Sequence, residues 1–224
     1  MLELFRILLL GATAGAVFAA VLGSLPIRQG SRLALGAGIG TWIALALALT
    51  ASGATRNAPF VVPAMFMLPL VAAGLAATST ASRSAMTAIP MPLIIALNAM
   101  RVLGVLMLIA GVTGVMSGPF PYAAGIGDMI TGLFALPVAR IAAKNPRDVR
   151  VLEWNIFGAL DLIVAVSLGV TFARTGSAAM TTLPWALIPL VLVPMYLIGH
   201  ALVFAHMRAT AVAGRSSQTR LAQA

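Results

Sequence analysis

Residues 91–115 read MPLIIALNAMRVLGVLMLIAGVTGV, a run of 25 residues in which Arg101 is the only charged side chain. A helix rises about 1.5 Å per residue, so about 20 apolar residues are enough to cross the hydrocarbon core of a bilayer. The stretch is therefore predicted to be a transmembrane helix, with Arg101 near its middle.

The composition of the whole chain agrees with this prediction. Of its 224 residues, 61% are hydrophobic and 8% are charged, and the mean hydropathy is +1.04. A soluble domain usually has about 25% charged residues, and a disordered chain has low hydrophobicity, so both classes are excluded. The chain has no cysteine, which excludes disulfides, thiolate metal sites, iron–sulfur clusters and thiol nucleophiles.

Outward from this helix, apolar runs separated by charged or Gly/Pro/Ser-rich breaks predict six further spans. The seven predicted spans are residues 4–25, 33–52, 60–78, 91–115, 121–142, 152–172 and 184–206. The expected fold class is an all-α membrane protein, in which residues 1–207 form a single bundle of about seven transmembrane helices. Residues 208–224 are expected to be a polar, disordered cytoplasmic tail.

The distribution of cations predicts the orientation of this bundle. One set of breaks and the tail holds ten cations, namely Arg28, Arg32, Arg83, Arg140, Lys144, Arg147, Arg150, Arg208, Arg215 and Arg220, and the opposite side holds Arg6, Arg56 and Arg174. Positively charged loops stay in the cytoplasm, so the N-terminus is expected outside and the C-terminus inside. The net charge of +9 thus reflects topology, and the expected partner is the lipid bilayer rather than nucleic acid.

Polar side chains are rare within the predicted spans. Those singled out as a candidate site all belong to the last four spans: Asn98, Arg101, Asp128, Asn155, Asp161 and His200. A charged side chain at the centre of a spanning helix costs about 2.5–3.5 kcal/mol, so such residues usually face the bundle interior and serve a function. They are expected to line a polar cavity within the membrane.

Depth along each span predicts which of these side chains meet. Arg101 and Asp161 both lie near the midplane and are expected to form an ion pair. Asp128 is expected nearer the outer surface, within reach of a long arginine stem but without a fixed cation, and so to be the carboxyl group that takes up a proton. His200 is expected nearer the inner surface, closer to the level of Asn98 and Asn155.

A set of short motifs connects these positions. They are Arg101, Ala124-Gly125-Ile126-Gly127-Asp128, Trp154-Asn155-x-x-Gly158-x-x-Asp161-Leu162, and Val193-Pro194 with His200. Together, over roughly residues 98–200, they resemble a group of small, uncharacterised bacterial polytopic integral-membrane proteins. The resemblance implies that these residues belong together, and with the charge pattern it favours a multi-pass protein of the bacterial inner membrane. It implies no activity.

The first functional hypothesis is that the cavity binds or transports a small solute, an ion or a proton, without a cofactor or metal. A second is an intramembrane enzyme acting on a lipid, in which Asp128, Asp161 and His200 bind Zn²⁺ or a similar metal. Their predicted depths spread over about 15 Å, which argues against one shared ion. A third is a non-catalytic membrane subunit with a protein partner.

Two observations leave structural alternatives open. Arg101 and Asp161 could do no more than fix the packing of their two helices. The pairs Gly11/Gly15 and Gly36/Gly40 have the spacing that allows close helix contact, either inside one bundle or between two copies in a homo-oligomer.

Overall fold

The computed structural model describes residues 28–58 and 60–222, together with positions 12, 15, 16, 19, 20 and 23. All of the secondary structure in this part of the chain is helical. The predicted span 4–25 lies largely outside the described residues.

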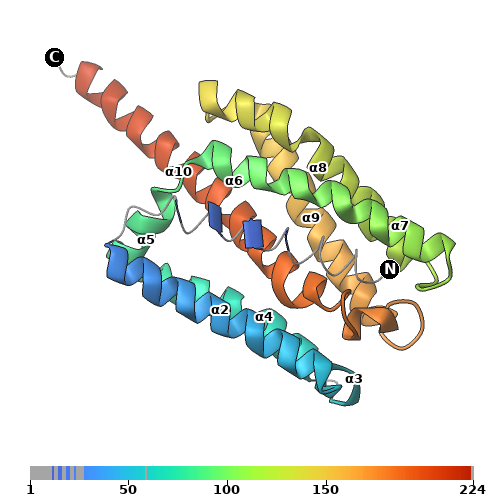
Figure 1. Ribbon diagram of the computed structural model, residues 1–224. Coiled ribbons are helices and arrows are strands. Elements are labelled where there is room, and N and C mark those ends of the chain that lie inside the picture. Colours follow the sequence, from blue (N-terminus) through green and yellow to red (C-terminus); the bar gives the residue numbers. More distant parts are fainter. Residues whose placement is uncertain are drawn as a thin grey trace.

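The described elements follow one another as a series of helices with short connections (Figure 1). They are α2 (Gln29–Ala51), α3 (Ala54–Asn57), α4 (Val61–Ala76), α5 (Thr80–Thr87), α6 (Met91–Leu97), the 3₁₀ helix η1 (Asn98–Gly104), α7 (Val105–Val112), α8 (Phe120–Lys144), α9 (Val149–Thr171), the 3₁₀ turn η2 (Ala178–Thr181), the π-helical turn η3 (Ile188–Leu192) and α10 (Val193–Ala222).

Four helical segments are long and apolar enough to cross a membrane. They are Met91–Val112, Phe120–Lys144, Val149–Thr171 and Ile188–Ala209. They coincide with the last four predicted spans, although the last one begins at Ile188 instead of residue 184. The prediction that the second half of the chain forms four helices able to span a bilayer is therefore confirmed.

The first half differs from the predicted pattern. The expected span 60–78 contains α4, which passes the test for a membrane span only together with α5, and α5 follows residue 78 at an angle of 108° to α4. Thr78 and Ser79 interrupt the apolar run, and the Ser79 side chain accepts a hydrogen bond from the Ser82 backbone N–H, which starts α5 in a new direction. The apolar segment Leu35–Ala51 is shorter than a full span. The count of seven spans and the orientation stay predictions.

At its other end, α10 continues as a helix as far as Ala222, through the stretch for which the sequence predicts a disordered tail. Alanine is frequent in this stretch and proline is absent from it. Both favour continuation of a helical backbone.

α8 is the central element of the second half. It packs against α6, η1, α7 and α9, and α10 contacts α9, α4 and α6. The outward faces remain apolar, with exposed side chains such as Leu133, Leu160 and Val170. Less than half of each spanning segment is buried inside the bundle. A bundle with large apolar outer faces is suited to lipid contact.

Two apolar clusters mark the two ends of this bundle. One joins the start of α6, the end of α8, the start of α9 and α10, and includes Ile89, Ala142 and Val203. The other joins α7, the start of α8 and the segment before η3, and includes Phe120 and Trp185. The polar residues of the predicted site lie between these two clusters.

Candidate functional site

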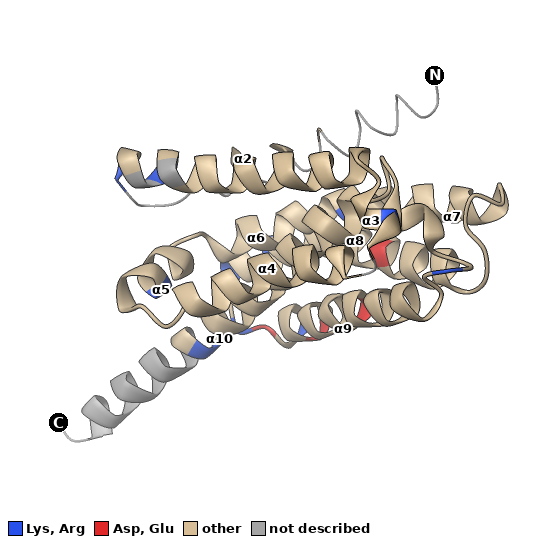
Figure 2. Cartoon of the chain, turned by 90° about the horizontal axis from the view of Figure 1, so that it is seen from below, with Lys and Arg blue, Asp and Glu red and all other residues tan. Residues whose placement is uncertain are grey.

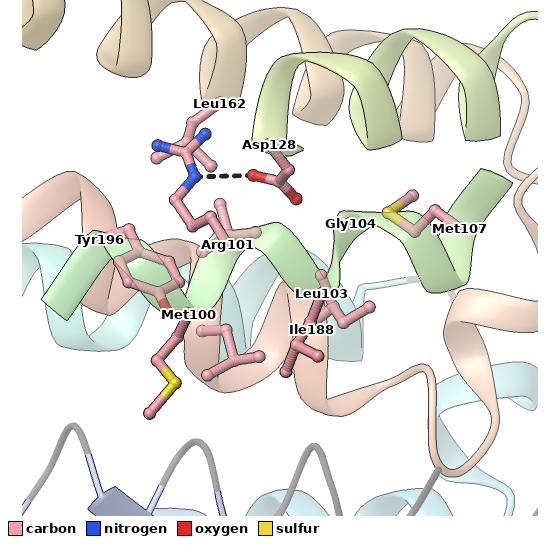
Figure 3. A pocket seen from close by; sticks show the side chains of 11 residues that line it. Met100, Arg101, Leu103, Gly104, Met107, Asp128, Leu162, Ile188 and Tyr196 are labelled. Atoms are coloured by element: carbon pink, nitrogen blue, oxygen red, sulfur yellow. Dashed lines mark hydrogen bonds and ion pairs between the residues drawn. The ribbon is translucent and has the colours of Figure 1, made fainter. Parts of the chain in front are cut away.

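The Arg101 side chain is the centre of the site, and 1% of it is exposed. Its Nε donates to Oδ1 of Asp128 at 2.7 Å, and its Nη2 donates to Oδ2 of Asp161 at 2.5 Å. Figure 3 shows the guanidinium and the Asp128 carboxyl group pointing toward one another. One buried cation from η1 is therefore shared by a carboxyl group of α8 and a carboxyl group of α9.

The remaining amino group of Arg101 faces α9 and α10. Nη1 lies 3.3 Å from the backbone oxygen of Gly158 and 3.1 Å from Nε2 of His200. Because a guanidinium can only donate, Nε2 of His200 is the acceptor. Nδ1 of the same ring lies 2.8 Å from Oδ1 of Asn155 and therefore carries the proton. His200 is thus a neutral imidazole held between Arg101 and Asn155.

Two further contacts fix the orientation of the imidazole. The Asn155 amide nitrogen donates to the backbone oxygen of His200 at 3.1 Å, which also settles which end of the Asn155 amide is the oxygen. The ring of Trp154 lies 5.4 Å from the imidazole, measured between ring centroids, and its indole N–H donates to the backbone oxygen of Thr131 at 3.0 Å. α8, α9 and α10 are therefore joined around His200.

Two glycines make room for these contacts. A side chain at Gly158 would place its Cβ 2.6 Å from Cε1 of His200, and a Cβ at Gly127 would overlap the carboxyl group of Asp161. Both positions thus allow helices to approach until their polar groups reach Arg101. At position 127 only glycine leaves room for the Asp161 carboxyl group, which lies against the backbone of α8 next to Asp128.

A small cavity of about 30 Å³ adjoins Arg101 and Asp128. The ring of Tyr196 lies on one side of the guanidinium, with its centroid 5.7 Å from Cζ, a distance typical of a cation–π contact. The other residues around the cavity are Met100, Leu103, Gly104, Met107, Leu162, Ile188, Leu192 and Val193 (Figure 3). The cavity has room for about one or two water molecules.

The site contains more negative than positive formal charge. Arg101 is its one cation, Asp128 and Asp161 are two carboxyl groups, and the geometry of His200 makes it neutral. The Asp161 side chain is 8% exposed and the Asp128 side chain is 20% exposed. With both carboxyl groups ionised, one negative charge in the bundle would have no partner within the cluster.

The structure brings together five of the six predicted site residues. The expected Arg101–Asp161 pair is formed. The expectation that Asp128 has no fixed cation is wrong, because the planar guanidinium donates from separate nitrogens to both carboxyl groups. His200, expected at a different depth, meets the same guanidinium because η1 and the close packing at Gly158 bring α10 to its level.

Asn98 is the exception. It is buried and lies one turn before Arg101, but its amide nitrogen donates to the backbone oxygen of Ile94 at 3.0 Å. Its Oδ1 has no hydrogen-bond partner within the described part of the chain. The cluster instead includes Tyr196, which the sequence analysis missed although it lies one helical turn before His200.

The alternative metal ligands do not form a metal site here. One carboxyl oxygen of Asp128, one of Asp161 and Nε2 of His200, which are atoms that could bind a metal, all accept hydrogen bonds from the guanidinium of Arg101. The guanidinium therefore occupies the position between them. Among the described residues, no group of three or more His, Cys, Asp or Glu side chains is arranged to hold a metal ion.

A contrasting ion pair lies at the start of α9, between its N-cap residue Asp148 and Arg150 in its first turn. Asp148 caps α9 by accepting from the backbone N–H of Arg150, and its carboxyl group also accepts from the Arg150 guanidinium at 2.8 Å. These hydrogen bonds lower the pKa of Asp148 to about 2. This pair, in which the Arg150 side chain is exposed, has one charge of each sign and is a control for the buried cluster.

Comparison with known proteins identifies a family but no activity. No curated protein and no solved structure matches the chain. One family model, described as Domain of unknown function (DUF8737), matches residues 58–208. These residues include α4 to α9, the first half of α10 and all of the Arg101 cluster. The chain therefore belongs to the family of the Domain of unknown function DUF8737.

Proposed function

We propose that this chain is a multi-pass protein of the bacterial inner membrane that carries a proton, alone or together with a small solute or ion, through the bundle of α6 to α10. The observation that carries the proposal is the sharing of one buried guanidinium, that of Arg101, by Asp128 and Asp161.

The charge of the cluster supports a bound proton. An uncompensated charge within a membrane is costly, and two carboxyl groups near one site are therefore rarely both ionised. One proton shared between Asp128 and Asp161 makes the cluster neutral with Arg101. Loss and uptake of that proton then change the charge of the site by one unit, which is the property that a proton carrier needs.

The size of the cavity favours a proton over a larger cargo at this position. A volume of about 30 Å³ admits about one or two water molecules and no organic solute. Apart from Arg101, Asp128 and Tyr196, its walls are apolar, so they offer few oxygen ligands for a metal cation. A water molecule beside Asp128 would be sufficient to pass a proton to it or to take one away.

Two irregular helical turns next to the cavity provide a place for movement. Arg101 lies in the 3₁₀ helix η1, and Ile188 and Leu192 lie in the π-helical turn η3, which contains Pro189. Such turns within a spanning helix often mark functional hinges. Rearrangement of η1 against η3 would open the cavity towards one apolar end cluster or the other.

The proposal is tested by proton flux into proteoliposomes. An imposed pH gradient should decay faster with the reconstituted wild-type protein than in empty vesicles, and Asp128→Asn and Asp161→Asn should each slow it to the rate of empty vesicles. Each variant keeps one carboxyl group paired with Arg101, so the fold is expected to be retained. The control is Asp148→Asn, which removes a carboxyl group outside the spans.

Unchanged flux in both Asp→Asn variants would show that the cluster fixes helix packing only. If wild-type vesicles conduct no protons in the absence of other solutes, the assay is repeated with candidate solutes on the acidic side. Failure of every one of them to cause proton entry would overturn the proposal.

A further inference from the structure

A second polar feature lies at the end of the bundle where α5 turns across α10. α5 contacts α10, and a cleft of about 650 Å³ opens between them. Its lining residues are Arg83, Ala201, Phe204, Ala205 and Arg208. Figure 2 shows basic segments on α5 and α10 at this end of the molecule. The cleft thus combines two cations with an apolar wall.

The wall contributed by α10 has a regular pattern. Ala201, Phe204, Ala205 and Arg208 are spaced at i, i+3, i+4 and i+7, so they lie on one face of the helix. The two alanines leave a shallow track beside the Phe204 ring, and Arg208 is exposed at one end of it. Ala201 is about 10 Å from Arg208 along the helix axis, towards the middle of the span.

The opposite wall holds Arg83 in a fixed position. Its Nε donates to the backbone oxygen of Ala77 at 3.0 Å, close to the end of α4. This contact uses Nε of Arg83 and leaves the two terminal amino groups, Nη1 and Nη2, for other partners. Arg83 and Arg208 take part in no ion pair within the described residues, whose carboxyl-group pairs are to Arg101 and Arg150.

We propose that this cleft binds an anionic phospholipid, with its phosphate between Arg83 and Arg208 and the first part of an acyl chain along Phe204 and Ala201. Arginine is well suited to phosphate because its planar group donates two parallel hydrogen bonds. A basic pocket between helices at the cytoplasmic end of a span is a typical place for acidic headgroups. The apolar track distinguishes a lipid from a free phosphate ion, which would use the arginines alone.

The test compares lipid binding by the purified full-length chain in nanodiscs. Native mass spectrometry counts phosphatidylglycerol molecules retained from a mixture with phosphatidylcholine. Wild-type protein should retain phosphatidylglycerol preferentially, and Arg83→Gln with Arg208→Gln should weaken this retention about tenfold or more. The control is Lys144→Gln with Arg147→Gln, which removes two exposed cations from the end of α8 and the turn that follows it, outside the cleft.

Two further measurements make the result decisive. Phe204→Ala should weaken retention of phosphatidylglycerol without removing a charge, and inorganic phosphate should not displace the lipid. Equal losses in the cleft variant and the control variant would overturn the proposal, since the attraction would then be a general effect of charge. Displacement by inorganic phosphate, or no effect of Phe204→Ala, would replace the lipid site with a free-anion site and would equally overturn it.

Discussion

At the scale of single residues, Arg101 unites side chains from three other helices. Its guanidinium donates to Asp128, Asp161, His200 and the Gly158 backbone oxygen, which uses four of its five N–H groups. Few other side chains could do this, because lysine lacks the planar arrangement of donors. The contribution of the cluster to the stability of the fold is therefore expected to depend mainly on Arg101.

Arg101→Gln is expected to destabilise the fold by about 3–5 kcal/mol, because it leaves two buried carboxyl groups without their cation. Adding Asp128→Asn and Asp161→Asn to this variant should recover part of the loss, since a neutral cluster no longer needs the guanidinium. Unfolding followed by circular dichroism in detergent measures both effects. A mild effect of Arg101→Gln, with no recovery in the triple variant, would contradict the central role of this residue.

Asp148, the N-cap residue of α9, predicts a dependence of stability on pH that is confined to acid. Hydrogen bonds from Arg150 lower its pKa from 3.8 to about 2, so its stabilising contribution is present above pH 3.8 and is lost as the pH falls through 2. Asp148→Asn is therefore expected to leave the pH profile of the unfolding temperature unchanged near neutral pH and to alter it only in acid. A changed profile near neutrality would show that Asp148 is coupled to another titrating group.

At the scale of helices, close approach at glycines positions the cluster. Gly104 of η1 faces α8, where a Cβ would lie 2.8 Å from the backbone oxygen of Gly125, and Gly132 faces the backbone of Val102. These contacts bring η1 and α8 together, so that Arg101 and Asp128 meet. The polar site is thus a consequence of backbone packing as well as of side-chain charge.

Gly127→Ala tests this packing directly. Its Cβ would overlap the Asp161 carboxyl group, so the substitution should displace this carboxyl group from Arg101 and cost about 1–3 kcal/mol, as overpacking usually does. Gly74→Ala is the matched control, because a Cβ at that exposed position in α4 meets nothing within 4 Å. Equal unfolding temperatures for the two variants would show that α8 and α9 are not held as close as described.

The helices themselves were largely predictable from the sequence, and their meeting points were only partly so. Long apolar runs give the last four spans, and depth along the runs gives the pair of Arg101 with Asp161. Depth alone left Asp128 within reach of Arg101 but without a fixed cation, and it placed His200 at a different level. The arithmetic ignores helix crossing, the 3₁₀ turn and the ability of one guanidinium to pair with two carboxyl groups. The polar residues at Ser79 predicted the end of the third span, but nothing in the sequence predicted that the chain then forms the helix α5.

At the scale of the whole molecule, cations gather at one end of the bundle. The end of α8 and the starts of α6 and α9 lie at the same end of the bundle (Figure 1), and the predicted cytoplasmic loops between these helices belong to this end. The apolar cluster that contains Phe120 and Trp185 lies at the other end. The arrangement of the described helices is thus compatible with the orientation predicted from the charges.

The absence of cysteine from the sequence makes this orientation simple to test. Single cysteines are introduced as Ser117→Cys, at the end near Phe120, and as Arg147→Cys, at the basic end; both positions are exposed. A thiol reagent that does not cross membranes should label the first in intact spheroplasts and the second only after lysis. The reverse pattern would invert the predicted orientation.

The most direct test of the central claim is infrared spectroscopy of the carboxyl groups in the purified protein. If Asp128 and Asp161 share one proton beside Arg101, the wild-type protein should show the carbonyl stretch of a protonated carboxylic acid near neutral pH, with a shift in heavy water. This band should persist in Asp148→Asn and disappear in Asp128→Asn and in Asp161→Asn, where the remaining carboxyl group pairs with Arg101 as an anion. Absence of the band from the wild-type protein, or its persistence in both buried variants, would contradict the account.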